Sequence, residues 1–143
     1  MRESRITPRI RRLVVARAFG CCEYCLSQEA YATHDFSIEH IFPLALGGSS
    51  DESNLALACQ GCNGFKSDKT HATDPVSKSL VPLFHPRDQR WADHFGWSHD
   101  SQTVIGLTEE GRGTVNLLKL NRPGLINLRA MLLATNRHPP QLS

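Results

Sequence analysis

The chain has 143 residues, 40% of them hydrophobic, and its 16 basic and 14 acidic side chains give a net charge of +2. This length suits one domain over residues 1–143, and a hydrophobic content slightly below the globular average indicates a core that needs an additional stabilising element. The absence of any run of about 18 apolar residues excludes a membrane-spanning helix, and residues 1–12 lack the apolar stretch of a secretory signal. We therefore expect an intracellular, cytoplasmic protein that does not contact a membrane.

The charges are unevenly distributed. Basic side chains concentrate in residues 1–17 and 112–143, and all but one of the acidic side chains lie between these segments. Two basic ends around an acidic centre suit a protein that binds a polyanion at its flanks and cations in its middle. The plainer alternative is that these arginines are the solvated faces of helices.

The first predicted element is a helix from residue 9 to residue 19. Thr7 is suited to cap its start, Pro8 to occupy its first position, and Gly20 to end it. An apolar stripe along this helix predicts that one side of it is buried.

Two C-x-x-C pairs come next, Cys22 with Cys25 and Cys59 with Cys62, and Cys21 is left over. Five cysteines in an intracellular protein argue against a disulfide framework, whereas four thiolates from two such pairs form the tetrahedral shell that structural zinc prefers. A redox-active pair is the alternative, which the second pair disfavours. The segment between the pairs is longer than the roughly 15–20 residues of a zinc ribbon, so a further element is inserted there.

The inserted segment predicts two short strands. Residues 36–41 and 55–58 are strand-like, and residues 47–54 between them have the composition of a loop. A helix is predicted from Gly61 to Asp68 and ends at a polar run. Strand, loop, strand and helix in this order, with a metal at the last corner, form a compact ββα unit.

The remaining third of the chain predicts further helices and one strand. Trp91 and Phe95 have the spacing of one helix face, and such aromatic side chains more often lie in a core than stack on bases. Residues 103–107 are strand-like. Thr108 is suited to cap a helix that runs to Leu120, and a last helix is predicted over residues 123–136.

Taken together, these motifs resemble those of the zinc-containing HNH endonucleases, in the variant that has asparagine in place of the last histidine. The residues that carry the resemblance are Cys22, Cys25, Glu39, His40, Ile41, Pro43, Gly47, Gly48, Asn54, Leu55, Cys59, Cys62, Asn63 and Lys66. The resemblance implies an α+β fold, in which residues 21–72 form a ββα-metal core with a four-cysteine structural zinc site. An N-terminal basic helix in residues 1–20 and a mixed α/β extension in residues 73–143 would flank this core.

The resemblance also implies a metal-dependent endonuclease that hydrolyses phosphodiester bonds of double-stranded DNA. His40 would be the general base, since a neutral imidazole with an ordinary pKa of about 6.5 can take a proton from water near neutral pH. Glu39 and Asn63 would hold one divalent cation, and their hard oxygen donors favour Mg²⁺ or Mn²⁺. Asn54 would hold the loop of residues 47–54 and orient His40 by hydrogen bonding. For Asn63, the plainer alternative is that it caps its helix. The same scaffold also suits a non-catalytic, zinc-stabilised module that binds nucleic acid.

Contacts with DNA phosphates are expected mainly from basic side chains. The N-terminal helix supplies three of them: Arg9, Arg12 and Arg17. Lys66 lies on nearly the same helix face as Asn63, from which it could reach a phosphate. His71 and His85 are secondary candidates. No base preference follows, because backbone phosphates carry no base information, and monomer and dimer both stay open.

Overall fold

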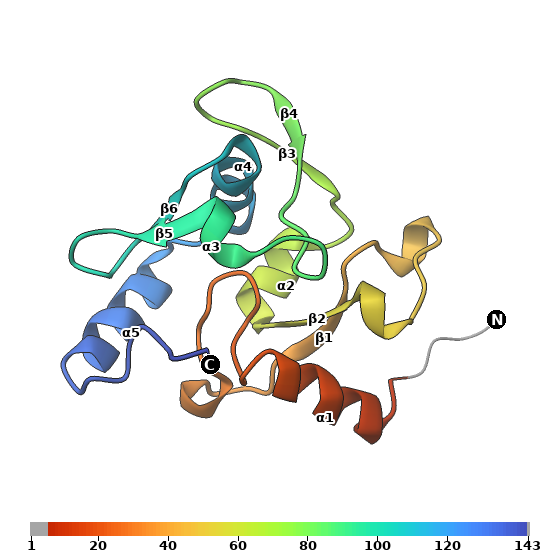
Figure 1. Ribbon diagram of the computed structural model, residues 1–143, viewed down its shortest axis with the longest axis horizontal. Helices are drawn as coiled ribbons and strands as arrows, with labels where there is room; N and C mark the ends of the chain where they lie inside the picture. Colours follow the sequence, from red (N-terminus) through yellow and green to blue (C-terminus); the bar gives the residue numbers. More distant parts are fainter. Residues whose placement is uncertain (1–5, 143) are drawn as a thin grey trace.

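The computed structural model describes residues 6–142, so that Arg2 and Arg5 of the basic N-terminal segment lie outside the described residues. Helices and three two-stranded antiparallel sheets make up a mixed α+β fold, which confirms the predicted class (Figure 1). None of the helices within residues 6–142 is long and apolar enough to cross a membrane.

The first helix, α1 (Pro8–Arg17), forms where the sequence predicts it. Thr7 is its N-cap, and the Thr7 hydroxyl accepts a hydrogen bond from the Ile10 amide at 3.2 Å. The apolar side of α1 packs on the core through Val14, which is fully buried. Gly20 follows the helix with a φ of 69°, a left-handed conformation that glycine adopts without steric cost and that turns the chain towards the first cysteine pair.

The segment between the cysteine pairs forms a hairpin. Strand β1 (Ser37–His40) pairs antiparallel with β2 (Leu55–Ala58), so that Glu39 lies opposite Ala56 and His40 opposite Leu55. Helix α2 (Gln60–Lys66) follows β2 directly, so two strands and a helix follow one another in the predicted order. Every residue of β2 is buried, because β2 contacts α1 and lies against the core (Figure 1).

Short 3-10 helices connect these elements. They are η1 (Glu29–Tyr31), η2 (Leu44–Leu46) and η3 (Glu52–Asn54). The last two lie in the loop between β1 and β2.

A second hairpin, which the sequence analysis missed, follows α2. Strands β3 (His71–Thr73) and β4 (Leu80–Pro82) pair antiparallel, although residues 70–75 look like a polar break. The hairpin is stabilised by packing against α4 (Glu109–Leu118), which buries Ala72 and Val81. Tertiary contact therefore overrides the weak strand propensity of this segment.

Helix α4 begins as predicted, with Thr108 as its N-cap, and it continues through two glycines, Gly111 and Gly113. A Cβ atom on Gly111 would lie 2.1 Å from the His94 carbonyl oxygen, and one on Gly113 would lie 2.9 Å from a methyl group of Val81. These glycines are therefore sites of close approach between α4 and its neighbours.

The prediction that Trp91 and Phe95 share a helix face is wrong, because α3 (Trp91–His94) is a single turn and Phe95 begins a strand. That strand, β5 (Phe95–Trp97), pairs with β6 (Val104–Gly106), which lies within the predicted residues 103–107. The aromatic rings stack on one another inside the extension, 5.1 Å apart for Trp91 and Phe95, as expected for core residues.

The last helix, α5 (Pro123–Leu133), begins where predicted and ends three residues earlier than expected. Arg122, just before it, is its N-cap residue.

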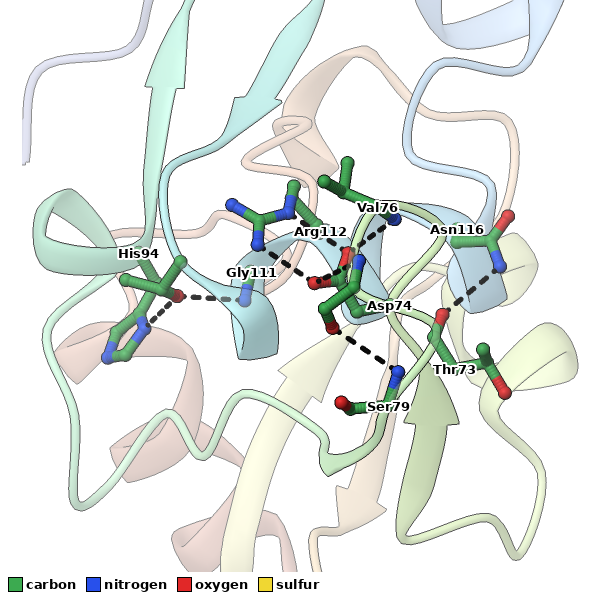
Figure 2. A network of polar contacts seen from close by, with 10 residues as sticks. Thr73, Asp74, Val76, Ser79, His94, Gly111, Arg112 and Asn116 are labelled. Carbon is green, nitrogen blue, oxygen red and sulfur yellow. Dashed lines mark hydrogen bonds and ion pairs between the residues drawn. The ribbon is translucent and has the colours of Figure 1, made fainter.

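The carboxylate of Asp74, fully buried at the end of β3, connects the β3–β4 hairpin to α4 (Figure 2). It accepts two parallel hydrogen bonds from the Arg112 guanidinium, at 3.0 and 2.8 Å, and two more from the backbone amides of Val76 and Ser77. The Arg112 hydrogen bonds, supported by these amides, hold the pKa of Asp74 well below its ordinary value.

Replacing Asp74 with asparagine should lower the melting temperature by several degrees at pH 7, because the Arg112 guanidinium loses its charged partner. Since the pKa of Asp74 is lowered in the folded chain, its contribution is present above the unfolded pKa of about 3.9 and is lost as the pH falls further. Thermal melts of both chains at pH 7 and pH 3 measure the difference, which should shrink at pH 3. Asp68→Asn, at an exposed position, is the matched control; equal melting of all three chains would contradict the prediction.

Candidate metal centre and active site

The two cysteine pairs meet at one buried point. The sulfur atoms of Cys22, Cys25, Cys59 and Cys62 all lie within 4.8 Å of one another, and those of Cys25 and Cys59 are 3.7 Å apart. Four sulfurs bound tetrahedrally to zinc at about 2.3 Å would be separated by about 3.8 Å. The cluster can therefore hold a metal ion such as zinc, as predicted.

Cys21 does not join this cluster. Its sulfur lies 3.5 Å from the Phe19 carbonyl oxygen, and burial raises the pKa of its thiol to about 11. It is the spare cysteine that the spacing indicated.

A cation that no sequence motif indicated, Arg122, lies beside the sulfurs. Its guanidinium donates to the sulfur of Cys59 at 3.3 Å and to that of Cys62 at 3.7 Å. Burial acts to lower the pKa of Arg122, but the thiolates of Cys62 and Cys59 outweigh it and raise this pKa. A Cβ atom on Gly61 would lie 2.5 Å from the guanidinium, so glycine there leaves room for it. Because about 60 residues separate Arg122 from its partners, no local spacing could have indicated this contact.

Glu39 and Lys66 form a buried ion pair. Their side chains are 4% and 2% exposed, and the ammonium lies 2.5 Å from Oε1 of Glu39 and 2.9 Å from the Ile41 carbonyl oxygen. Oε2 of Glu39 accepts a hydrogen bond from the Tyr24 hydroxyl at 2.7 Å. Burial raises the pKa of Glu39, and its two partners oppose this shift.

The expected phosphate contact of Lys66 is therefore not available in this structure, and that expectation is corrected. Lys66 lies on the side of α2 that packs against β1, so its ammonium is removed from solvent and needs a carboxylate partner. The helix periodicity placed Lys66 near Asn63 without indicating that this side faces inward.

His40 lies on the other face of β1 from Glu39 and is only half-buried. Both can serve one site only because β1 ends at His40. Nε2 of His40 lies 2.9 Å from the hydroxyl of Ser50, a partner that the sequence analysis missed because nothing distinguishes it within the loop. Burial, and then the charge of Lys66, lower the pKa of His40, so its imidazole is neutral near pH 7.

Asn54 holds the loop that follows His40. Its amide accepts from the Phe42 backbone nitrogen at 2.8 Å and donates to the carbonyl oxygens of Phe42 and Ser49. These contacts agree with the expected role in the loop, but the hydrogen bond to the imidazole comes from Ser50 instead. The expected role of Asn54 in orienting His40 by hydrogen bonding stays a prediction.

Asn63 is half-buried on α2, one residue after a sulfur of the cluster. Its amide makes no side-chain hydrogen bond within residues 6–142, which leaves its oxygen available to a cation. The alternative role of Asn63 as a helix cap is wrong, because Cys59 is the N-cap of α2 and its sulfur accepts from the Cys62 amide.

A cleft of about 380 Å³ borders the ion pair between the hairpin and the extension. Its lining includes Lys66, Phe42 and the two secondary candidates, His71 and His85. The structure therefore brings both histidines to the neighbourhood of the site.

The three arginines of α1 have different environments. Arg9 and Arg12 are exposed, whereas Arg17 donates to the carbonyl oxygens of Glu52 and Leu55 at 2.8 and 2.5 Å. Burial lowers the pKa of Arg17. Arg17 connects α1 to the end of the loop, so the expectation that it binds phosphate is corrected.

Removing the metal from the cysteine cluster should unfold the protein, because a buried structural zinc contributes folding free energy directly. We expect the helical circular dichroism to collapse when a strong chelator takes zinc away and to return when zinc is added back. Removal of Mg²⁺ alone is the control, and it should leave the circular dichroism spectrum unchanged. If elemental analysis finds no zinc and the spectrum is still that of the folded protein, this expectation is contradicted.

Replacing Arg122 with glutamine should weaken zinc binding by about 10-fold, because the thiolates lose a neighbouring positive charge and hydrogen-bond donor. Competition with a chromophoric chelator measures the affinity. Arg90→Gln, at an exposed position, is the matched control. Unchanged affinity in the Arg122 variant would show that the guanidinium does not support the cluster.

Comparison with known proteins gives one result. Residues 22–78, which contain both cysteine pairs, the β1–β2 hairpin and α2, match the family model described as HNH endonuclease. No curated protein and no solved structure matches the chain. The matched segment includes the residues that carried the resemblance, and it extends into the β3–β4 hairpin. Over residues 22–78 this protein is therefore similar to the HNH endonuclease family.

Proposed function

We propose that the protein is a metal-dependent endonuclease that hydrolyses phosphodiester bonds of double-stranded DNA. In this proposal β1, β2 and α2 are a ββα-metal core, and the cysteine cluster holds a structural zinc. The observation that carries the proposal is the neutral, half-exposed imidazole of His40 beside the buried carboxylate of Glu39, within the residues that match the family.

The three segments of the chain are proposed to act as one domain. Arg122 of the extension contacts the sulfurs of the core, and the indole nitrogen of Trp91 donates to the Tyr24 carbonyl oxygen at 2.9 Å. Arg17 connects the N-terminal helix to the same core. These contacts support a site whose geometry depends on all three segments.

His40 has the properties of a general base. Hydrolysis needs a water molecule that loses its proton as it attacks phosphorus, and a neutral imidazole can accept that proton. The Ser50 hydroxyl restrains the ring at 2.9 Å, and because a hydroxyl both donates and accepts, this contact can persist when the ring becomes protonated. The lowered pKa keeps the base in its neutral form throughout the neutral pH range.

Glu39 and Asn63 have the donor chemistry for a hard divalent cation. Carboxylate and amide oxygens suit Mg²⁺ or Mn²⁺, and the free amide of Asn63 supports the assignment. When bound, such a cation would stabilise negative charge on the phosphate. Lys66 already neutralises Glu39 in this structure, so a cation at Oε1 would have to share the carboxylate with the ammonium or displace it.

DNA binding is proposed to involve backbone phosphates and the exposed side chains of α1. Arg9 and Arg12 are free of ion pairs within the described residues, so both can contact phosphate. The carbonyl oxygen of Glu52, in the loop that leads to the site, accepts a hydrogen bond from Arg17 at 2.8 Å, which places α1 beside that loop. DNA phosphates bound to Arg9 and Arg12 of α1 would therefore lie close to the loop that follows His40.

Replacing His40 with alanine should reduce nicking of supercoiled plasmid by about 10² to 10⁴-fold, because the attacking water loses its base. DNA binding, measured by fluorescence anisotropy, should stay at the wild-type level. The wild-type rate should decline only below about pH 6.5, since protonation inactivates the base and the pKa of His40 is lowered.

His99→Ala, at an exposed histidine of the extension, is the matched control and should cut at the wild-type rate. A non-catalytic module that binds nucleic acid is the competing function. Equal nicking by wild type and His40→Ala, or no metal-dependent nicking by either, would favour that module and refute the nuclease.

A further inference from the structure

Tyr24 joins the cysteine cluster to the proposed active site. It lies between Cys22 and Cys25 in the chain, and its side chain is fully buried. Its hydroxyl donates to Oε2 of Glu39 at 2.7 Å. A buried tyrosine hydroxyl needs a polar partner, and here this partner is the carboxylate proposed to hold the catalytic cation.

The position of the Tyr24 hydroxyl is fixed by contacts around the first cysteine pair. The Glu23 amide donates to the Leu57 carbonyl oxygen at 2.8 Å, and the Glu23 carboxylate accepts from the Leu57 amide at 2.9 Å, so the pair is tied to β2. The Tyr24 ring packs edge-on against Phe84, with the ring centres 6.5 Å apart. The sulfurs of Cys22 and Cys25 secure both sides of the tyrosine when they bind metal.

The Glu39 carboxylate needs such a restraint. Rotation about the last torsion of a glutamate side chain is broad, so the plane of the carboxylate is set by its hydrogen-bond partners. Tyr24 occupies Oε2, and Oε1 is directed towards Lys66, which lines the cleft. Without the hydroxyl, only the flexible lysine would orient this carboxylate.

We propose that Tyr24 is a positioning residue, through which the metal-bound cysteine cluster sets the orientation of Glu39 towards its divalent cation. This inference rests on the proposed function, since it takes Glu39 as a ligand of that cation. It predicts that loss of one hydroxyl weakens the binding of the catalytic cation while the structural zinc stays in place.

The test compares Tyr24→Phe with Tyr31→Phe, which removes the hydroxyl of the exposed tyrosine and is the matched control. Mn²⁺ alone is titrated calorimetrically into each zinc-loaded full-length chain, and plasmid nicking is measured against Mn²⁺ concentration. We expect Tyr24→Phe to bind Mn²⁺ about 10-fold more weakly and to need about 10-fold more Mn²⁺ for half-maximal nicking. Zinc content should stay at the wild-type level, and Tyr31→Phe should match the wild type throughout.

Two results would overturn the inference. One is equal Mn²⁺ affinity in Tyr24→Phe and the wild type. The other is a variant that loses zinc together with Mn²⁺ binding, which would show that Tyr24 only supports the fold.

Failure of the proposed function looks different in the same experiment. A wild type that binds Mn²⁺ but cuts no DNA refutes the nuclease, while the Mn²⁺ titration of Tyr24→Phe still decides the role of the tyrosine. Glu39→Gln checks that the measured binding is at the proposed site, because it should abolish that binding. A wild type that binds no Mn²⁺ refutes both proposals.

Discussion

Four cysteine sulfurs within 4.8 Å of one another are the constraint on which the rest of the structure depends. As thiolates they would repel one another, and a cation such as zinc bound among them would offset this repulsion. The cluster brings residues 22–25 and 59–62 together. It thereby holds together the two ends of the segment that contains the β1–β2 hairpin. Arg122 donates hydrogen bonds to two of these sulfurs, which links the extension to the same point.

The β1–β2 hairpin places one charged and one neutral side chain on opposite faces of β1. Adjacent residues of a strand face opposite sides, so Glu39 is directed into the protein and His40 towards the loop. A buried carboxylate requires partners, and Lys66 and Tyr24 provide them from α2 and from the first cysteine pair. The histidine needs no such pairing, because it is half-exposed and uncharged near pH 7. One strand end thereby carries a buried anion and a neutral base side by side.

The extension supports this arrangement through close packing. Two glycines let α4 approach its neighbours closely, and Asp74 connects the β3–β4 hairpin to α4 through Arg112 (Figure 2). In Figure 1 the β3–β4 hairpin and α1 lie at opposite ends of the view, with the β1–β2 hairpin and α2 between them. The elements that carry the proposed site therefore lie between the two flanking segments in this view.

The sequence by itself determined the helices with clear caps, such as α1 after Thr7 and α4 after Thr108. It also determined which four cysteines form the cluster. Caps and C-x-x-C spacing are local signals, so both can be recognised without the tertiary structure. The sequence also identified residues 22–70 as similar to the family whose model matches residues 22–78. Only the tertiary structure decided which partners the charges have. Lys66 and Arg17 look like free surface cations in the sequence and are bound to Glu39 and to backbone carbonyl groups, while Arg122 reaches the sulfurs from about 60 residues away. Spacing along a chain reports which residues share an element, whereas burial and the choice of counter-ion depend on which elements meet.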